Sequence, residues 1–142
     1  MTYASLDQLA ARYTTRMLID LTDRSDPPAG VVDEAVINRE MASSDAVIDG
    51  HLAGRYRLPL AESPPLLADL AAIITIYKLH PFDPDPKITR DYTEALRTLR
   101  DIASGAVRLP LAGVEPDSRA GVGVKTTDRE RPFSNENLTG FV

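Results

Sequence analysis

The stretch that most constrains the fold runs from Leu66 to Leu79. Eleven of its fourteen residues are apolar, and only Asp69, Thr75 and Lys78 interrupt it. A helix that is apolar nearly all round must be packed on most sides by other elements. The stretch is shorter than the ~20 residues that a membrane-spanning helix needs. It therefore predicts a buried helix around which the rest of a compact body is arranged.

The flanking sequence has the spacing of amphipathic helices. We expect further helices starting at Ser5, over 15–21, from 33 to about 56, and from about 85 to a stop at Gly105. Ser5 and Gln8 form a capping-box pattern. Ser63 is expected to cap the apolar helix, with Pro64 and Pro65 in its first turn. The inner face of the last helix is expected to carry Ile88, Tyr92, Ala95, Leu96, Leu99, Ile102 and Ala103.

The helix predicted over residues 33–56 would be the longest, at about 36 Å. The expected fold class is therefore mainly α, a compact bundle of about five helices with one long helix. After Gly105 the helical period is lost, so we expect a helical domain at 1–105 and an extended or partly disordered C-terminal arm at 106–142. The length of 142 residues suits one such domain.

The acidity of the chain belongs to the helical part. Residues 1–105 carry 11 Lys and Arg against 16 Asp and Glu, which gives the whole net charge of −5, and residues 106–142 carry five of each sign. Affinity for phosphates comes from clustered Lys and Arg, and no basic stripe is evident along the sequence. A nucleic-acid-binding role is therefore not expected.

Few residues are suited to catalysis. The chain has no cysteine, which removes disulfides, thiolate metal sites and cysteine nucleophiles. His51 is expected to pack on a helix, and His80 to cap a helix end. Asp83, Asp85 and Asp91 could act as oxygen ligands, but they fit turn and N-cap roles better. We therefore predict no enzyme, no cofactor and no metal.

The last residues place apolar side chains on an otherwise polar segment. These are Phe133, Leu138, Phe141 and Val142. One interpretation is a frayed chain end. The other is an anchor that fills pockets of a partner, which in an oligomer would be the next subunit. We carry these four residues forward as candidate partner-binding residues.

Four segments, in order along the chain, resemble a known family. They are Tyr3–Leu9, Ile48–Leu60, Leu96–Gly105, and Pro132–Ser134 with Leu138–Phe141. Together they are similar to the Mu-like phage and prophage head-to-tail joining proteins. The main departure is the acid- and proline-rich loop at Asp23–Gly30.

The resemblance implies an adaptor ring at the capsid neck of a virion, made in the bacterial host cytoplasm. Its subunits would contact one another, the portal protein whose ring they match, and stopper or tail proteins. DNA would pass through the lumen as cargo without sequence recognition, and no membrane or catalytic residue is implied. Asp45 and Asp49, expected on the water-facing side of the long helix, are candidates for lining the lumen, where like charge would let DNA slide.

Two other functions stay open on the sequence alone. The first is a cellular helical protein–protein interaction module that forms no ring. The second is a small metal-dependent hydrolase that uses Asp83, Asp85 and His80. The mass of the protein in solution and on capsids separates the module from the connector, and metal analysis of the purified protein tests the hydrolase.

Overall fold

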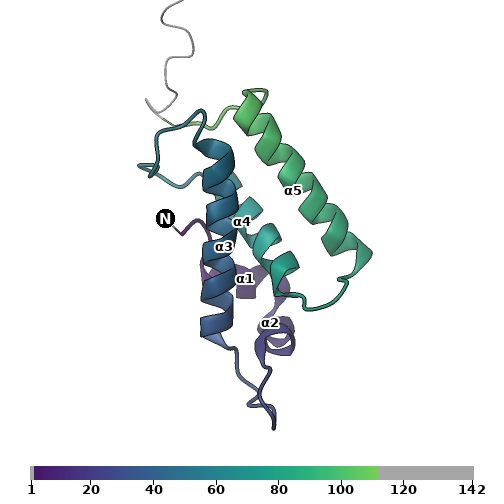
Figure 1. The fold of residues 1–142 in the computed structure, drawn as a ribbon. Helices are drawn as coiled ribbons and strands as arrows, with labels where there is room; N and C mark the ends of the chain where they lie inside the picture. The colour runs from purple at the N-terminus through teal and green to yellow at the C-terminus, as the bar shows by residue number, and fades with distance from the viewer. Residues whose placement is uncertain (1, 112–142) are drawn as a thin grey trace, which may run out of the picture.

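The computed structural model describes residues 2–111, which form five α-helices and no strand (Figure 1). The helices are α1 (Leu6–Tyr13), α2 (Thr15–Thr22), α3 (Glu34–Leu52), α4 (Pro65–Leu79) and α5 (Pro86–Ser104). This confirms the predicted mainly α bundle. Within residues 2–111, no helix combines the length and the hydropathy that crossing a bilayer requires.

Helix α4 is the centre of the bundle, as its composition predicts. It packs against α3, α5 and α1 (Figure 1). More than half of its residues are buried: Leu67, Leu70, Ala71, Ala72, Ile74, Thr75, Ile76 and Leu79. These side chains serve two core clusters. One cluster joins α4 to α5 and the second half of α3, and the other joins α4 to α1, α2 and the first half of α3.

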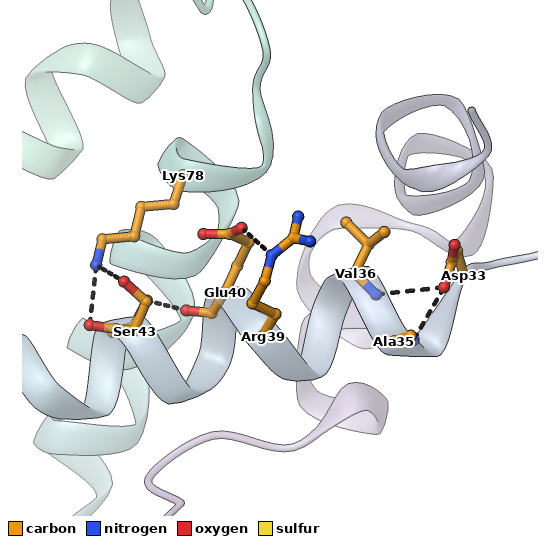
Figure 2. A network of polar contacts seen from close by, with 8 residues as sticks. Asp33, Ala35, Val36, Arg39, Glu40, Ser43 and Lys78 are labelled. Atoms are coloured by element: carbon orange, nitrogen blue, oxygen red, sulfur yellow. Dashed lines mark hydrogen bonds and ion pairs between the residues drawn. The ribbon is translucent and has the colours of Figure 1, made fainter.

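Polar groups also connect α4 to α3, both inside the core and at its edge. The fully buried Thr75 hydroxyl donates to the Ser44 hydroxyl at 3.0 Å, and Ser44 donates to the carbonyl of Glu40 at 2.8 Å. Lys78 reaches across to Ser43, donating to its carbonyl at 2.9 Å and its hydroxyl at 2.7 Å (Figure 2). Burial lowers the pKa of Lys78. Each of these polar groups has a partner, so their burial does not leave an unsatisfied group.

The helix ends follow the sequence signals with one exception. Ser5 and Gln8 make the predicted capping box, and Asp85 caps α5. The prediction that Ser63 caps α4 is wrong: the N-cap is Pro64, which makes no side-chain hydrogen bond. Pro64 is extended, with ψ 143°, because the ring of Pro65 disfavours helical backbone in the residue before it. The helix therefore starts at Pro65.

Helix α3 is shorter than predicted. It ends at Leu52 rather than near Tyr56, so its 19 residues span about 28 Å, and α5 has the same length. Gly50 and Gly54 weaken the helical preference there. The chain then turns so that Tyr56, whose N–H still bonds the Leu52 carbonyl at 2.8 Å, is buried in the core.

The packed body continues beyond α5. The Val107 N–H donates to the carbonyl of Asp101 at 3.1 Å, and the Leu109 N–H donates to the Tyr56 hydroxyl at 3.2 Å. The Leu109 side chain is buried in the same cluster as Tyr56. The first six residues after Gly105 are therefore held against the helices, whereas the rest of the predicted arm lies outside the described residues. On α5, Ala103 is exposed, contrary to its predicted place on the inner face.

Candidate assembly surfaces

The segment before α1 is fastened to one side of α3. Tyr3 is 3% exposed. Its N–H donates to Oδ1 of Asp45 at 3.1 Å, and its hydroxyl donates to Oδ1 of Asp49 at 2.5 Å. The two carboxylates are four residues apart and so lie on one face of the helix. These hydrogen bonds hold the N-terminal segment against the face of α3 that the sequence predicted to be exposed to solvent.

This contact corrects the prediction for Asp45. Asp45 was expected to face water but is only 8% exposed, and Asp49 is partly buried. The cause is the docking of Tyr3, which is 42 residues away from Asp45 along the chain. Whether either carboxylate lines a lumen concerns an assembly of copies, so that assignment stays a prediction.

The electrostatics of this contact favour neutral forms. Burial raises the pKa of Asp45, although the hydrogen bond from the Tyr3 N–H works in the opposite direction. Burial, followed by the hydrogen bond to Asp49, raises the pKa of the Tyr3 hydroxyl well above its usual value. Tyr3 therefore remains a neutral donor at physiological pH.

A groove of about 660 Å³ lies between α1, the first half of α4 and the N-terminal segment. It is lined by Tyr3, Gln8, Ala11, Arg12, Ser63, Pro65, Ala68, Asp69 and Ala72. Nη1 of Arg12 pairs with Oδ1 of Asp69 at 2.5 Å. The walls thus combine small apolar side chains with one surface ion pair, and no histidine lies among the lining residues. This composition suits contact with a protein surface better than catalysis.

The loop between α2 and α3 projects past the ends of both helices (Figure 1). Asp23 organises it, accepting hydrogen bonds from the Ser25 hydroxyl, the Ser25 N–H at 3.2 Å and the Gly30 N–H at 2.7 Å. The hydrogen bond from the Ser25 hydroxyl and those from the backbone lower the pKa of Asp23. The segment from 20 to 34 carries five carboxylates, Asp20, Asp23, Asp26, Asp33 and Glu34, against one arginine. The loop is therefore an acidic projection whose backbone is held by hydrogen bonds within the loop itself.

The outward side of α5 carries three arginines, with the exposed Glu94 and the half-buried Asp101 on the same side. Arg90, Arg97 and Arg100 are all exposed, and none of them makes an ion pair with a residue in the range 2–111. Lys87, by contrast, is paired with Asp91 at 2.5 Å. The three arginines do not stand next to one another along the sequence, so they form no run of basic residues. The spacing of seven and three residues, which places all three on one side of a helix, was the available signal.

Two apolar side chains stand out on the surface. Phe82, in the turn between α4 and α5, is 86% exposed, and Val31, at the end of the acidic loop, is 62% exposed. Single exposed apolar residues are common on monomers, so neither defines a surface alone. Val31 does give the acidic loop an apolar contact point.

The residues considered for catalysis have structural partners. Nδ1 of His51 lies 2.8 Å from the Val47 carbonyl, and Nδ1 of His80 lies 2.7 Å from the Ile76 carbonyl. Asp85 accepts from the Lys87 N–H at 2.8 Å as a helix cap, while Lys87 pairs with Asp91 and so lowers its pKa. In the described part of the chain, no three His, Asp or Glu side chains are grouped as a metal site. The tail residues Phe133, Leu138, Phe141 and Val142 lie outside residues 2–111.

Comparison with known proteins gives matches along most of the chain. A family model described as Bacteriophage Mu, Gp36 matches residues 3–126. Gene product J of Escherichia phage Mu is 30% identical over 142 residues, covering 100% of both chains. The Mu-like prophage FluMu protein gp36 of Haemophilus influenzae is 33% identical over 140 residues, covering 99% of this chain and 98% of that protein. These relatives are all phage or prophage proteins.

Proposed function

Because the chain belongs to the Bacteriophage Mu Gp36 family, we propose that it is a non-enzymatic head-to-tail connector subunit. Copies form a ring at the capsid neck of the virion, between the portal and the stopper or tail proteins. DNA passes through the lumen as cargo, without recognition of its sequence. Of the two lumen candidates, Asp49 retains more access to solvent than Asp45.

The observation that supports this proposal best is the structural role of the segment 48–60, where the resemblance to joining proteins is most detailed. Its apolar members Ile48, Leu52, Tyr56 and Leu60 are all buried in one core cluster. The guanidinium of Arg55 lies against Gly105, at the end of α5. These residues build one end of the bundle, and the part of the chain that the structure describes groups no three His, Asp or Glu side chains as a metal site. An assembly protein requires residues like these, which stabilise its fold and take no part in a reaction.

The test is to remove the gene from the phage or prophage that carries it. We expect heads and tails to form but to remain unjoined, since the connector would be missing between them. Purified full-length protein added to these extracts should restore joined particles, and images of the neck should show a ring. Normal particles without the gene would contradict the proposal, as would a protein that binds a cellular partner as a persistent monomer.

A further inference from the structure

We propose that the arginine face of α5, formed by Arg90, Arg97 and Arg100, docks on the acidic α2–α3 loop of a second copy of the chain. This inference rests on the proposed function, because it names the contact between neighbouring subunits of the ring. It assigns the partner by charge complementarity between two surfaces of the same molecule. It gives a role to the ordered acidic loop between α2 and α3.

The arginine face is fixed in its outward direction. The opposite side of α5 is buried through Ala95, Leu99 and Ile102, so the helix cannot rotate to hide the arginines. From residue 90 to residue 100 the face is about 15 Å long. The three guanidinium groups outnumber the exposed Glu94 carboxylate between them, and none of them forms an ion pair within residues 2–111. They favour a partner that presents several carboxylates, with which arginine makes bidentate contacts.

The loop presents such carboxylates from an ordered backbone. Asp23 closes the loop through its bonds to Ser25 and Gly30, and the Asp33 N–H donates to the buried Thr22 hydroxyl at 3.1 Å. The side chains of Asp26 and Glu34 are exposed and make no ion pair within residues 2–111. A surface that is ordered before contact loses less entropy on binding.

The two surfaces lie on different elements of one molecule. The loop projects beyond the ends of α2 and α3 (Figure 1), whereas the arginine face lies on the side of α5 opposite its buried residues. A contact between two different surfaces of identical copies is heterologous, and such contacts close into rings when the rotation between neighbours permits. DNA is a less favoured occupant, because a row of three arginines stands on a domain whose charges sum to −5 over residues 1–105.

Charge reversal tests the contact in the full-length chain. Arg97→Glu alone and Asp26→Arg alone should each place like charges across the interface and lower the assembled fraction at least tenfold. The double variant Arg97→Glu with Asp26→Arg restores opposite charges and should recover assembly. An equal mixture of the two single variants should also assemble, because the copies can alternate around the ring. Arg57→Glu, at an exposed arginine outside both surfaces, is the control and should assemble normally.

Cysteine cross-linking locates the contact independently, since the chain has no cysteine of its own. Arg97→Cys mixed with Asp26→Cys should give a disulfide-linked dimer under mild oxidation, both in concentrated protein and in particles. Each single variant on its own should give far less of it. A cross-link in either preparation supports the inference, and none in both overturns it.

The outcomes separate this inference from the proposed function. If the protein occupies the neck but the charge-reversed single variants assemble normally, the inference is wrong and the proposed function stands. If the single variants fail and neither the double variant nor the mixture recovers, Arg97 serves another partner, such as DNA phosphates, and the inference is overturned. If the protein is absent from particles, the proposed function is wrong, and the cross-link in concentrated protein decides the inference alone.

Discussion

Asp45 is an acidic side chain that the fold removes from water. Its only hydrogen bond among the described residues comes from the Tyr3 N–H, and burial raises its pKa. A buried carboxylate with one donor is stabilised less than it would be in water, where several donors reach it. Asp45 therefore binds the N-terminal segment, but burying its charged carboxylate lowers the stability of the folded protein.

We expect Asp45→Asn to stabilise the protein at neutral pH by about 0.5–1 kcal/mol. Asparagine keeps the oxygen that accepts from Tyr3 and removes the charge. Because the folded pKa of Asp45 is raised, this residue favours the wild-type fold most below the ordinary aspartate pKa near 3.9. That stability is lost as the pH rises through the folded pKa. Urea unfolding from pH 3 to pH 7 should therefore show an advantage of the variant that grows with pH.

The matched control for this prediction is Asp83→Asn, at an exposed position. It should show no comparable growth in stability relative to the wild-type protein. Equal stability of Asp45→Asn and the wild-type protein at every pH would mean that the burial of this carboxylate carries no penalty.

At the scale of the helices, the sequence predicts the starts of α1, α2, α4 and α5 and the ends of α2, α4 and α5 to within about a residue, because caps and apolar periods are local signals. Local signals determine the end of α3 only in part, through Gly50 and Gly54. It also depends on Tyr56 turning back into the core, where the Tyr56 hydroxyl accepts a hydrogen bond from the N–H of Leu109 beyond α5. The same limit explains Asp45, whose burial depends on Tyr3. The arginine face of α5 could have been predicted from the sequence, because the spacing of its three arginines places them on one side of a predicted helix.

Gly105 is favoured at the end of α5 mainly by its backbone conformation. Its φ is +85°, a left-handed conformation, and an added Cβ would lie 2.5 Å from Cζ of Arg55. We expect Gly105→Ala to lower the free energy of unfolding by about 1–2 kcal/mol from the backbone alone, with a further loss where Arg55 must move. Thermal unfolding of the full-length chain measures this.

Gly50→Ala is the control for the cap, because it adds the same methyl group within α3, where nothing lies within 4 Å. Alanine is favoured over glycine inside a helix by about 1 kcal/mol. This variant should therefore be as stable as the wild-type protein or more stable. If the two variants lose stability equally, the cap at Gly105 has no special role.

For the molecule as a whole, the boundary of the folded body is a testable quantity. Removing residues 112–142 should leave the unfolding temperature within a few degrees of the full-length value. Removing 106–142 also takes away Leu109, whose burial contributes about 1.5–3 kcal/mol. That loss should lower the unfolding temperature by several degrees or more. Calorimetry of both truncated chains gives the comparison.

The role of the C-terminal residues 131–142 is tested by measuring particle assembly. Removing only residues 131–142, which carry Phe133, Leu138, Phe141 and Val142, should leave the helical body folded and stop particle assembly. Normal particles from this shortened chain would show that these four residues anchor no partner. A large drop in its unfolding temperature would show that they belong to the core of the same copy.

The attachment of Leu109 to Tyr56 has a mechanical consequence. A pull on the chain beyond Leu111 reaches Tyr56, next to the end of α3, before it reaches the last turn of α5. Tension is therefore shared between two helices, and α5 is not peeled away from its free end.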